Sequence, residues 1–217
     1  QAFKVTDKVY WVGAIDWDLR NFHGYATDLG TTYNAFLILD EKVTLIDTVK
    51  APFFDEMVGR ISSVISPDKI DYIISNHSEM DHSGSLPKAY SLMKPEKIFA
   101  SPMGEKNLKA HFHDLPVDVV KTGDSLSLGD STLHFIANIL LLYSSKILDL
   151  LKSLPGLNLD IKIVAPDHGP MWKGDGIGYI LDLYRQFAEQ KPSLKGVVIY
   201  DTMWHSTELM ARSILDG

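Results

Sequence analysis

Four side chains that can bind a metal ion lie within six residues of one another: His77, Glu79, Asp81 and His82. They follow the apolar run 71–75, whose β-branched and aromatic residues predict a buried strand. After Gly84 the apolar residues recur at helical spacing, so the cluster falls on a strand-to-helix loop. A loop can aim these side chains at one point, whereas a regular helix or strand cannot at these offsets. The pattern therefore predicts a metal site; the alternative is a solvated polar loop with an unusual concentration of ligand-type residues.

A fifth candidate ligand, His168, lies far along the chain in the run Pro166-Asp167-His168-Gly169-Pro170. It also follows a predicted strand, 161–165, so both groups are expected on loops at one edge of a sheet. Taken alone, His168 could equally be structural. Mixed histidine and carboxylate ligands suit iron or manganese better than zinc. Two neighbouring cations need anionic ligands to offset their repulsion, so a dinuclear iron centre is physically sensible, although the spacing alone does not establish it.

Other polar residues have simpler interpretations. Asp47 ends the predicted strand 43–47. There it either caps the next helix or supports the metal ligands without binding the metal itself. His23 lies in a loop rich in glycine and aromatic residues, and by itself it is interpreted as a surface residue. Three further histidines are expected on the surface: His111, His113 and His134.

The composition is that of a globular protein rather than a nucleic-acid or membrane binder. The chain has 217 residues, of which 45% are hydrophobic and 23% charged, enough for one domain or for one and part of another. Its net charge of −7 argues against nucleic acid or an anionic membrane as the main partner. The absence of Cys excludes disulfides and thiolate chemistry. There is no apolar run of membrane-spanning length and no signal-peptide pattern, so we expect a cytoplasmic protein.

The predicted elements mix strands with helices, and a hairpin comes early in the chain. This order predicts an α/β sandwich with the candidate ligands on loops at one sheet edge. The predicted strands are 9–12, 34–39, 43–47, 71–75, 97–100, 117–120, 132–136 and 161–165, and the predicted helices are 51–65, 86–93, 104–113, 138–154 and 176–190.

The run His77-x-Glu79-x-Asp81-His82-x-Gly84 resembles the metal motif of the flavodiiron proteins, a branch of the metallo-β-lactamase fold. Ordinary hydrolases of that fold carry His at the position of Glu79. The resemblance is closest to the rubredoxin:oxygen oxidoreductases, and it implies a metallo-β-lactamase-like αββα sandwich. It also implies that His77 and Glu79 bind one iron, and that Asp81, His82 and His168 bind the other. His23 would then line the pocket where dioxygen or nitric oxide is reduced. Further matching segments are 13–17, 22–25, 30–35, 47–50 and 165–169.

The last part of the chain is similar to the start of a flavodoxin-like domain. A short apolar strand, 197–200, precedes a hydroxyl-rich turn, and a helix begins near Glu208. Hydroxyls and backbone N–H groups at such a turn can hold a phosphate with the aid of the helix dipole. A simple helix cap explains the turn taken alone, whereas the resemblance implies the phosphate loop that binds FMN. We therefore expect a diiron domain at 1–190, and a linker with the first strand and helix start of an FMN domain at 191–217. The turn residues are Thr202, Met203, Trp204, His205, Ser206 and Thr207.

Two departures from the family pattern bear on this interpretation. The sequence ends at Gly217, within the first helix of the flavodoxin-like part, so these residues alone are not expected to hold the FMN ring. The family also carries another iron-binding His and a bridging Asp between the counterparts of Ala137 and Asn138, where this sequence runs on directly. We therefore expect an internal gap at 137/138. A site without its bridge should bind iron weakly or not at all.

For an intact family member, the resemblance implies electron transfer from rubredoxin to FMN and then to two iron ions. The irons reduce dioxygen to water or nitric oxide to nitrous oxide, and the sequence does not distinguish between the two gases. The resemblance also implies a head-to-tail homodimer, with the FMN of one subunit beside the iron of the other. Two alternatives stay open: a zinc hydrolase of the metallo-β-lactamase fold, and a truncated scaffold without activity. Glu79 and the flavodoxin-like tail weigh against the hydrolase.

Overall fold

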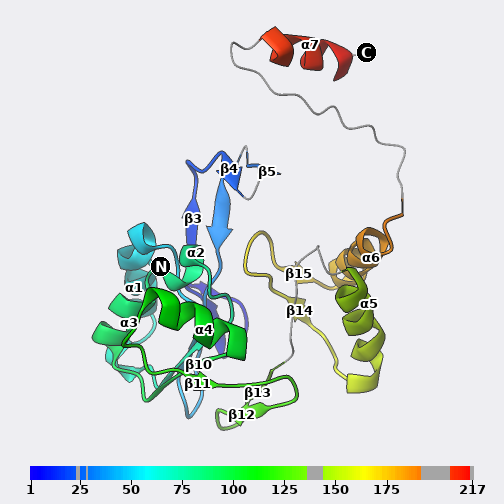
Figure 1. Ribbon diagram of the computed structural model, residues 1–217. Coiled ribbons are helices and arrows are strands. Elements are labelled where there is room, and N and C mark those ends of the chain that lie inside the picture. The colour runs from blue at the N-terminus through cyan, green and yellow to red at the C-terminus, as the bar shows by residue number, and fades with distance from the viewer. Residues whose placement is uncertain (23–24, 28, 136–143, 192–205, 216–217) are drawn as a thin grey trace. The chain divides into compact units, whose positions relative to one another are not determined.

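The computed structural model describes residues 1–22, 25–27, 29–135, 144–191 and 206–215. The chain divides into two compact units (Figure 1). The first comprises Gln1–Asn138 and Asp160–Ile177, and the second comprises Ile139–Leu159 and Gly178–Gly217. All the candidate ligands belong to the first unit, so the site can be described within it.

The first unit is built on a seven-stranded sheet in which strand direction follows from the connections. Neighbours from β1 to β8 are antiparallel, and β7 and β8 form the expected hairpin. Neighbours from β8 to β11 are parallel, because helices or long segments return the chain to the same edge between them. In spatial order the strands are β1 (Phe3–Lys4), β2 (Val9–Trp11), β7 (Phe36–Ile38), β8 (Thr44–Ile46), β9 (Tyr72–Ser75), β10 (Lys97–Ala100) and β11 (Asp118–Val119).

Four helices lie together on one side of this sheet (Figure 1). They are α1 (Phe54–Ser62), preceded by the turn η1 (Ala51–Phe53), α2 (Met80–Ser83), α3 (Leu86–Met93) and α4 (Pro102–His111). The apolar faces of α1, α3 and α4 are buried in one core with the strands, and this burial is the main term that stabilises the layer. The core includes Met57 and Ile61 of α1, Leu86, Ala89 and Met93 of α3, Leu108 of α4, and Leu37, Leu45, Ile73 and Ile98 of the sheet.

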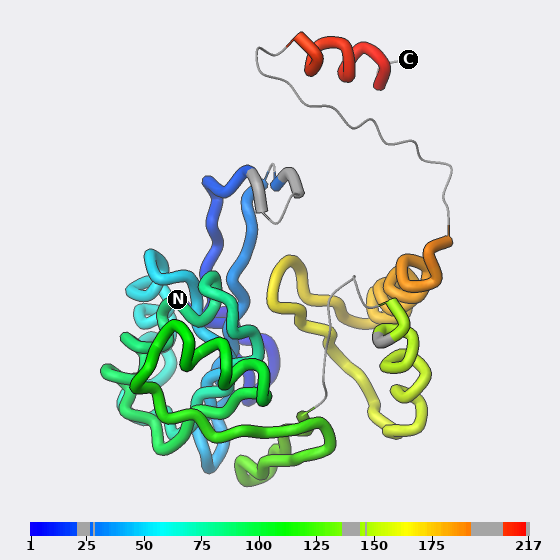
Figure 2. The backbone as a smooth tube through the Cα atoms, viewed as in Figure 1, coloured from blue at the N-terminus to red at the C-terminus, as the bar shows by residue number. Residues whose placement is uncertain are grey.

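Short strand pairs complete the first unit and can be followed along the tube in Figure 2. The hairpin of β14 and β15 (yellow in Figure 2) lies over the other side of the sheet, where an apolar groove of about 340 Å³ is lined by Phe36, Ile38, Ile46 and Ile163. The pairs are β3 (Ala14–Asp16) with β6 (Thr31–Tyr33), β4 (Asn21–Phe22) with β5 (Tyr25–Ala26), β12 (Ser125–Ser127) with β13 (Thr132–His134), and β14 (Ile163–Val164) with β15 (Trp172–Lys173).

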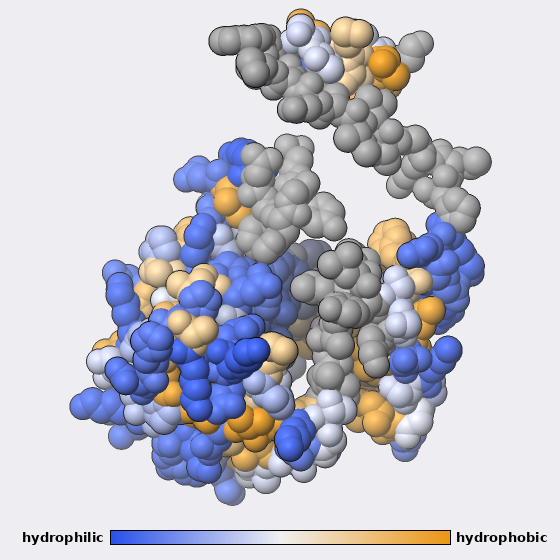
Figure 3. Space-filling view, viewed as in Figure 1, coloured by the Kyte–Doolittle hydropathy of each residue, from blue (hydrophilic) through white to orange (hydrophobic). Residues whose placement is uncertain are grey.

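The second unit contains α5 (Ser144–Ser153), most of α6 (Asp175–Ala188) and α7 (Ser206–Leu215). Helix α7 buries Ala211 but exposes four large apolar side chains, and orange surface lies on this helix in Figure 3. These are Leu209, Met210, Ile214 and Leu215. None of the described helices is long and apolar enough to cross a membrane.

The predicted strands and helices are found wherever the structure describes them, with bounds that differ by a few residues. The prediction of a loop throughout 77–84 was wrong, because Met80–Ser83 form the short helix α2. The predicted helix 138–154 is described from Ser144 onward, as α5. The expected strand 197–200 and the expected gap at 137/138 lie outside the described residues. The boundary at residue 190 stays a prediction.

Candidate metal centre

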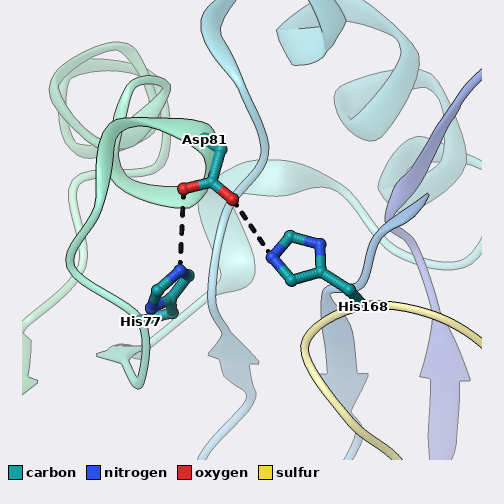
Figure 4. Close-up of side chains that lie close together, drawn as sticks. All are labelled: His77, Asp81 and His168. Atoms are coloured by element: carbon teal, nitrogen blue, oxygen red, sulfur yellow. Dashed lines mark ion pairs between the residues drawn. The ribbon is translucent and has the colours of Figure 1, made fainter. Parts of the chain in front are cut away.

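Two loops at the carboxyl ends of strands carry the candidate ligands. The loop after β9 holds His77, and α2 follows it with Asp81 and His82. The loop after β14 holds His168. Figure 4 shows His77 coming from the first loop, Asp81 from α2 and His168 from the second loop, with the three side chains turned toward one another.

Asp47, at the end of β8, fixes the first loop. Its Oδ1 accepts hydrogen bonds from the backbone N–H groups of Asn76 (2.7 Å) and His77 (3.0 Å). Burial, together with the nearby Asp167 charge, raises the pKa of Asp47 well above its usual value, and its φ of 59° lies in the left-handed region. Of the two sequence-based alternatives for Asp47, the structure supports the positioning of the loop rather than a helix cap. The turn that follows it has no side-chain cap.

Asn34 fixes the second loop from within the buried core. Its Nδ2 donates to the carbonyl oxygens of Pro166 (2.8 Å) and Gly169 (3.0 Å), and its backbone N–H donates to the carbonyl of Asp167 (2.9 Å). The Asn76 side chain also donates to Asp167 Oδ1 at 2.9 Å, which joins the two loops directly. The loops are thus held by hydrogen bonds that are independent of the ligand side chains themselves.

The Asp81 carboxylate lies between two imidazoles (Figure 4). Its Oδ1 is 3.6 Å from His77 Nε2, and its Oδ2 is 3.1 Å from His168 Nε2. One ligand atom from each of the three residues can be chosen so that all lie within 4.8 Å of one another. In the described part of the chain, this is the one such group of histidine and acidic residues that could hold a metal ion.

Electrostatics favour a charged carboxylate here. Burial acts to raise the pKa of Asp81, but the His168 hydrogen bond and the neighbouring imidazoles outweigh it and lower that pKa to about 2. Burial acts to lower the pKa of His168, whereas Asp81 and the Thr32 carbonyl raise it more. The Nδ1 of His168 lies 2.6 Å from the Thr32 carbonyl oxygen, so the proton belongs on Nδ1 and Nε2 faces Asp81.

His82 is the most enclosed of the candidate ligands. It is fully buried, and its ring centroid lies 5.0 Å from that of His77 and 4.9 Å from that of His168. Burial and the nearby His168 lower the pKa of His82 to about 3, so the ring is neutral. Neither ring nitrogen has a hydrogen-bond partner within the described structure. An unsatisfied buried polar atom costs about 1–3 kcal/mol, and a neutral imidazole is a good metal ligand, so a metal ion would remove this cost.

The distances among these residues fit one coordinated ion. Ligand atoms held about 2.1 Å from a metal in tetrahedral or octahedral geometry lie about 3 to 3.5 Å apart. The separations from Asp81 to His168 and His77, 3.1 and 3.6 Å, are close to that range. Two histidines with one carboxylate form a set typical of non-haem iron with open positions.

The other predicted site residues are not brought into this group. Glu79 has a side chain that is 50% exposed, and its Oε2 lies 3.9 Å from His77 Nε2. His23 and the turn residues Thr202, Met203, Trp204 and His205 lie outside the described residues. Ser206 and Thr207 are exposed at the start of α7, in the second unit. His111, His113 and His134 are exposed, as predicted.

Sequence reasoning gave no role to a neighbouring residue, Tyr33. Its fully buried ring packs edge-on against His82 and His168, at centroid distances of 6.1 Å. Its hydroxyl donates to Asp16 Oδ2 at 2.9 Å. Burial and the Asp16 carboxylate raise the pKa of Tyr33, so the phenol stays protonated. No local sequence signal indicated this role, because it depends on the pairing of β6 with β3.

Known proteins resemble this chain in sequence and in fold. Residues 31–147 match the ODP family beta lactamase domain, which is more than half of the chain. This chain belongs to the ODP family. It is 38% identical to the rubredoxin-oxygen oxidoreductase of Megalodesulfovibrio gigas, covering all of this chain and 68% of that protein. It is 35% identical to the nitric oxide reductase of Moorella thermoacetica, covering all of this chain and 69% of that one.

Solved structures agree with this assignment. The rubredoxin oxygen:oxidoreductase from Desulfovibrio gigas superposes with a TM-score of 0.83 at 38% identity, covering all of this ODP-family chain and 68% of that one. The flavodiiron protein from Giardia intestinalis gives a TM-score of 0.80 at 27% identity, covering 100% and 66%. The predicted metallo-β-lactamase-like fold is therefore confirmed, and the flavodoxin-like start stays a prediction.

The sequence alignments also show that this chain lacks internal residues of its relatives. The alignments with both proteins span 275 positions, whereas the whole of this chain, which they cover completely, has 217 residues. The relatives therefore carry residues within the aligned region that have no counterpart here. This difference is of the kind expected from a gap at 137/138, whose position stays a prediction.

Proposed function

We propose that this chain is the metal-binding part of a flavodiiron oxidoreductase that reduces dioxygen to water, nitric oxide to nitrous oxide, or both. The observation that carries the proposal is the meeting of His77, Asp81 and His168 from two strand-end loops. It occurs in a chain whose full length aligns with a rubredoxin-oxygen oxidoreductase and a nitric oxide reductase. A hydrolytic zinc site would have the same fold, but it would not use a Glu at the position of Glu79.

The proposed ligands of iron are His77, Glu79, Asp81, His82 and His168, as a pair of ions in the complete family member. When bound, iron supplies the change of oxidation state that gas reduction needs. The ionised Asp81 offsets the positive charge, and the neutral, fully buried His82 offers a lone pair. His168 keeps its proton on Nδ1 against the Thr32 carbonyl, which directs Nε2 toward the metal.

Protons and electrons must both reach this site. Reduction of dioxygen to two waters consumes four of each, and reduction of two nitric oxide molecules to nitrous oxide and water consumes two of each. We propose that FMN delivers the electrons, held by a flavodoxin-like part to which the turn from Thr202 to Thr207 belongs. A rubredoxin-type protein is the proposed donor, in line with the names of the relatives. A head-to-tail homodimer, a gas pocket lined by His23, and a cytoplasmic location complete the proposal.

The test is a single-turnover reaction on the chain loaded anaerobically with ferrous iron. We expect dioxygen or nitric oxide to oxidise the bound iron. The oxidation is measured as the decrease in ferrous iron per chain and as the accompanying change in the optical absorption spectrum. The Asp81→Asn variant should lose iron and reaction together, while the exposed-histidine control His111→Ala should behave as the wild type. A chain that selects zinc over iron in competition and hydrolyses a thioester or lactam would contradict the proposal.

A further inference from the structure

Trp11, on strand β2, contacts the support of the second metal loop although it lies far from the candidate ligands in the sequence. Its Nε1 donates a hydrogen bond of 2.8 Å to Asn34 Oδ1. On the same amide, Nδ2 donates to the carbonyl oxygens of Pro166 and Gly169, on either side of the candidate ligand His168. The contact therefore runs from β2, through one side-chain amide, to the loop that carries a ligand.

These hydrogen bonds fix which way round the Asn34 amide lies. Asn34 is only 4% exposed, so its oxygen and nitrogen need partners within the protein. Rotation of the amide by 180° would place Nδ2 against the Trp11 N–H, donor against donor, and Oδ1 against two carbonyl oxygens. Of the two orientations, the observed one satisfies both ends of the amide, and Trp11 supplies the bond that the oxygen accepts.

The Trp11 indole is itself held in place. Trp11 pairs with Phe36 of β7, and the Arg60 guanidinium lies over the indole ring, 4.8 Å from its centroid. Arg60 Nη1 also donates to the Gly13 carbonyl oxygen at 2.9 Å, which attaches α1 to the segment after β2. The cation covers a face of the ring whereas Nε1 lies on its edge, so the stacking and the hydrogen bond to Asn34 are separate interactions.

The position of the second loop decides where His168 points. His168 Nδ1 lies 2.6 Å from the Thr32 carbonyl oxygen, and the Gly169 N–H donates to Thr32 Oγ1 at 2.9 Å. Both contacts depend on the distance between β6 and the loop, and Asn34 sets that distance with three hydrogen bonds to the loop. A shift of the loop would therefore move His168 Nε2 away from Asp81, whose Oδ2 lies 3.1 Å from it (Figure 4).

We propose that Trp11 is a positioning residue of the metal centre. Through the Asn34 amide, its Nε1–H holds the loop 166–169 at the distance from β6 that directs His168 toward the metal. Trp11 acts through Asn34 rather than by contact with the metal. The inference adds a residue to the site of the proposed function, and it rests on that function only for the identity of the metal, because any divalent ion bound by His168 reports the effect.

The test compares two variants of the whole chain that remove different interactions of the indole. Trp11→Phe keeps an aromatic ring under Arg60 but removes the N–H, so the buried Asn34 oxygen loses its donor. Arg60→Met removes the stacked cation and the Gly13 hydrogen bond but keeps the indole N–H. We expect both variants to lower the free energy of unfolding in urea, measured without metal. Only Trp11→Phe should also weaken Mn²⁺ binding, by about fivefold, which is the effect of one net hydrogen bond.

A double-mutant cycle separates positioning from a general loss of stability. In the Asn34→Ala background the link is already broken, so Trp11→Phe should change the Mn²⁺ affinity no further. Additive losses of affinity in the double variant, or an equal loss in Arg60→Met, would overturn the inference. If Asn34→Ala does not fold, the comparison of Trp11→Phe with Arg60→Met decides by itself.

A spectroscopic measurement and a matched control complete the test. Co²⁺ bound to Trp11→Phe should differ from Co²⁺ bound to the wild type in its d–d absorption bands, because these bands depend on the geometry of the ligands. Trp17→Phe makes the same change at a residue that is 65% exposed, and it should bind Mn²⁺ as the wild type does. Identical Co²⁺ spectra, or an equal loss of affinity in Trp17→Phe, would count against a specific role of Trp11.

The proposed function and this inference fail separately. A chain that selects zinc over iron contradicts the function, whereas the inference still predicts weaker zinc binding by Trp11→Phe. Wild-type Mn²⁺ affinity in Trp11→Phe contradicts the inference and leaves the proposed function as it stands.

Discussion

Two clusters of buried or partly buried polar groups in the first unit are built in opposite ways. Around Asp40, the side-chain oxygens accept hydrogen bonds from Lys8 Nζ (3.0 Å) and from the backbone N–H groups of Glu41 (2.9 Å), Asp130 (3.2 Å) and Ser131 (2.8 Å). Around Asp81, by contrast, the buried His82 has no hydrogen-bond partner for either ring nitrogen. The first cluster satisfies its polar atoms within the chain, and it ties the β12–β13 turn to the turn after β7. The second leaves both ring nitrogens of His82 unsatisfied within the described structure, as expected of a binding site rather than of a structural cluster.

The largest expected effect is a metal-dependent gain in stability that only the Asp81 cluster provides. A ligand present at about 100 times its dissociation constant stabilises the folded state by about 2.7 kcal/mol. We expect Fe²⁺ or Mn²⁺ to raise the melting temperature of the wild type, and His82→Ala to abolish most of that increase. Thermal denaturation with and without metal measures it.

The matched control is Asp40→Ala, which removes a buried carboxylate of the structural cluster. This variant should melt at a lower temperature than the wild type, yet show the same rise when metal is added. An equal metal-induced rise in His82→Ala would remove the contrast between the two clusters.

A smaller effect is expected from Asp47, which supports the metal loop without belonging to the group of three ligands. Asp47→Ala removes the acceptor for the Asn76 and His77 amides and places alanine at a φ of 59°. We expect metal affinity to fall by about 10–100-fold and stability by about 1–3 kcal/mol, measured by metal titration and urea denaturation. Asp47→Asn keeps an acceptor oxygen and a residue tolerant of this backbone region, so it should lie much closer to the wild type. Similar metal affinity in all three proteins would mean that the loop is held without Asp47.

Much of the fold could be predicted from the sequence because its signals are local. Continuous apolar runs mark β9 and β10, and helical spacing marks α1 and α3, so these elements were predicted within a few residues. The loop position of His77 was predictable for the same reason, whereas Asp81 and His82 lie on the short helix α2 and not on the loop predicted for them. The hairpin order of β7 and β8 also follows from two adjacent apolar runs with a short turn between them.

The contacts between distant segments could not be predicted in the same way. In the sequence Asn34 is simply the first residue of an apolar run. In the structure its side chain donates hydrogen bonds to the loop 166–169, more than 130 positions away. The exposure of Glu79 could not be predicted either, since a motif gives the order of donors but not the direction of each side chain. The partnership of Tyr33 with Asp16 likewise depends on the pairing of β3 with β6, which local periodicity does not specify.

The smallest expected effect tests the structural cluster through pH. Hydrogen bonds from Ser131 lower the pKa of Asp40 below its usual value; burial opposes this shift, and Lys8, Glu41 and Asp130 add to it. A depressed carboxylate pKa stabilises the folded state above the unfolded-state pKa of about 3.9, and this contribution is lost as the pH falls below that value. We therefore expect Asp40→Asn to be less stable than the wild type at neutral pH, with the difference narrowing as the pH falls below about 4.

Urea denaturation of both proteins between neutral and acidic pH measures this difference, and Asp7→Asn is the control because Asp7 is 99% exposed. The Asp7→Asn profile should run parallel to that of the wild type. The experiment is best done without metal, because protonation of Asp81 and its neighbours would add the loss of the bound ion to the same pH range. The free energies of unfolding of Asp40→Asn and the wild type could instead differ by the same amount down to strongly acidic pH. That result would show that hydrogen-bond geometry, rather than the charge of Asp40, stabilises this cluster.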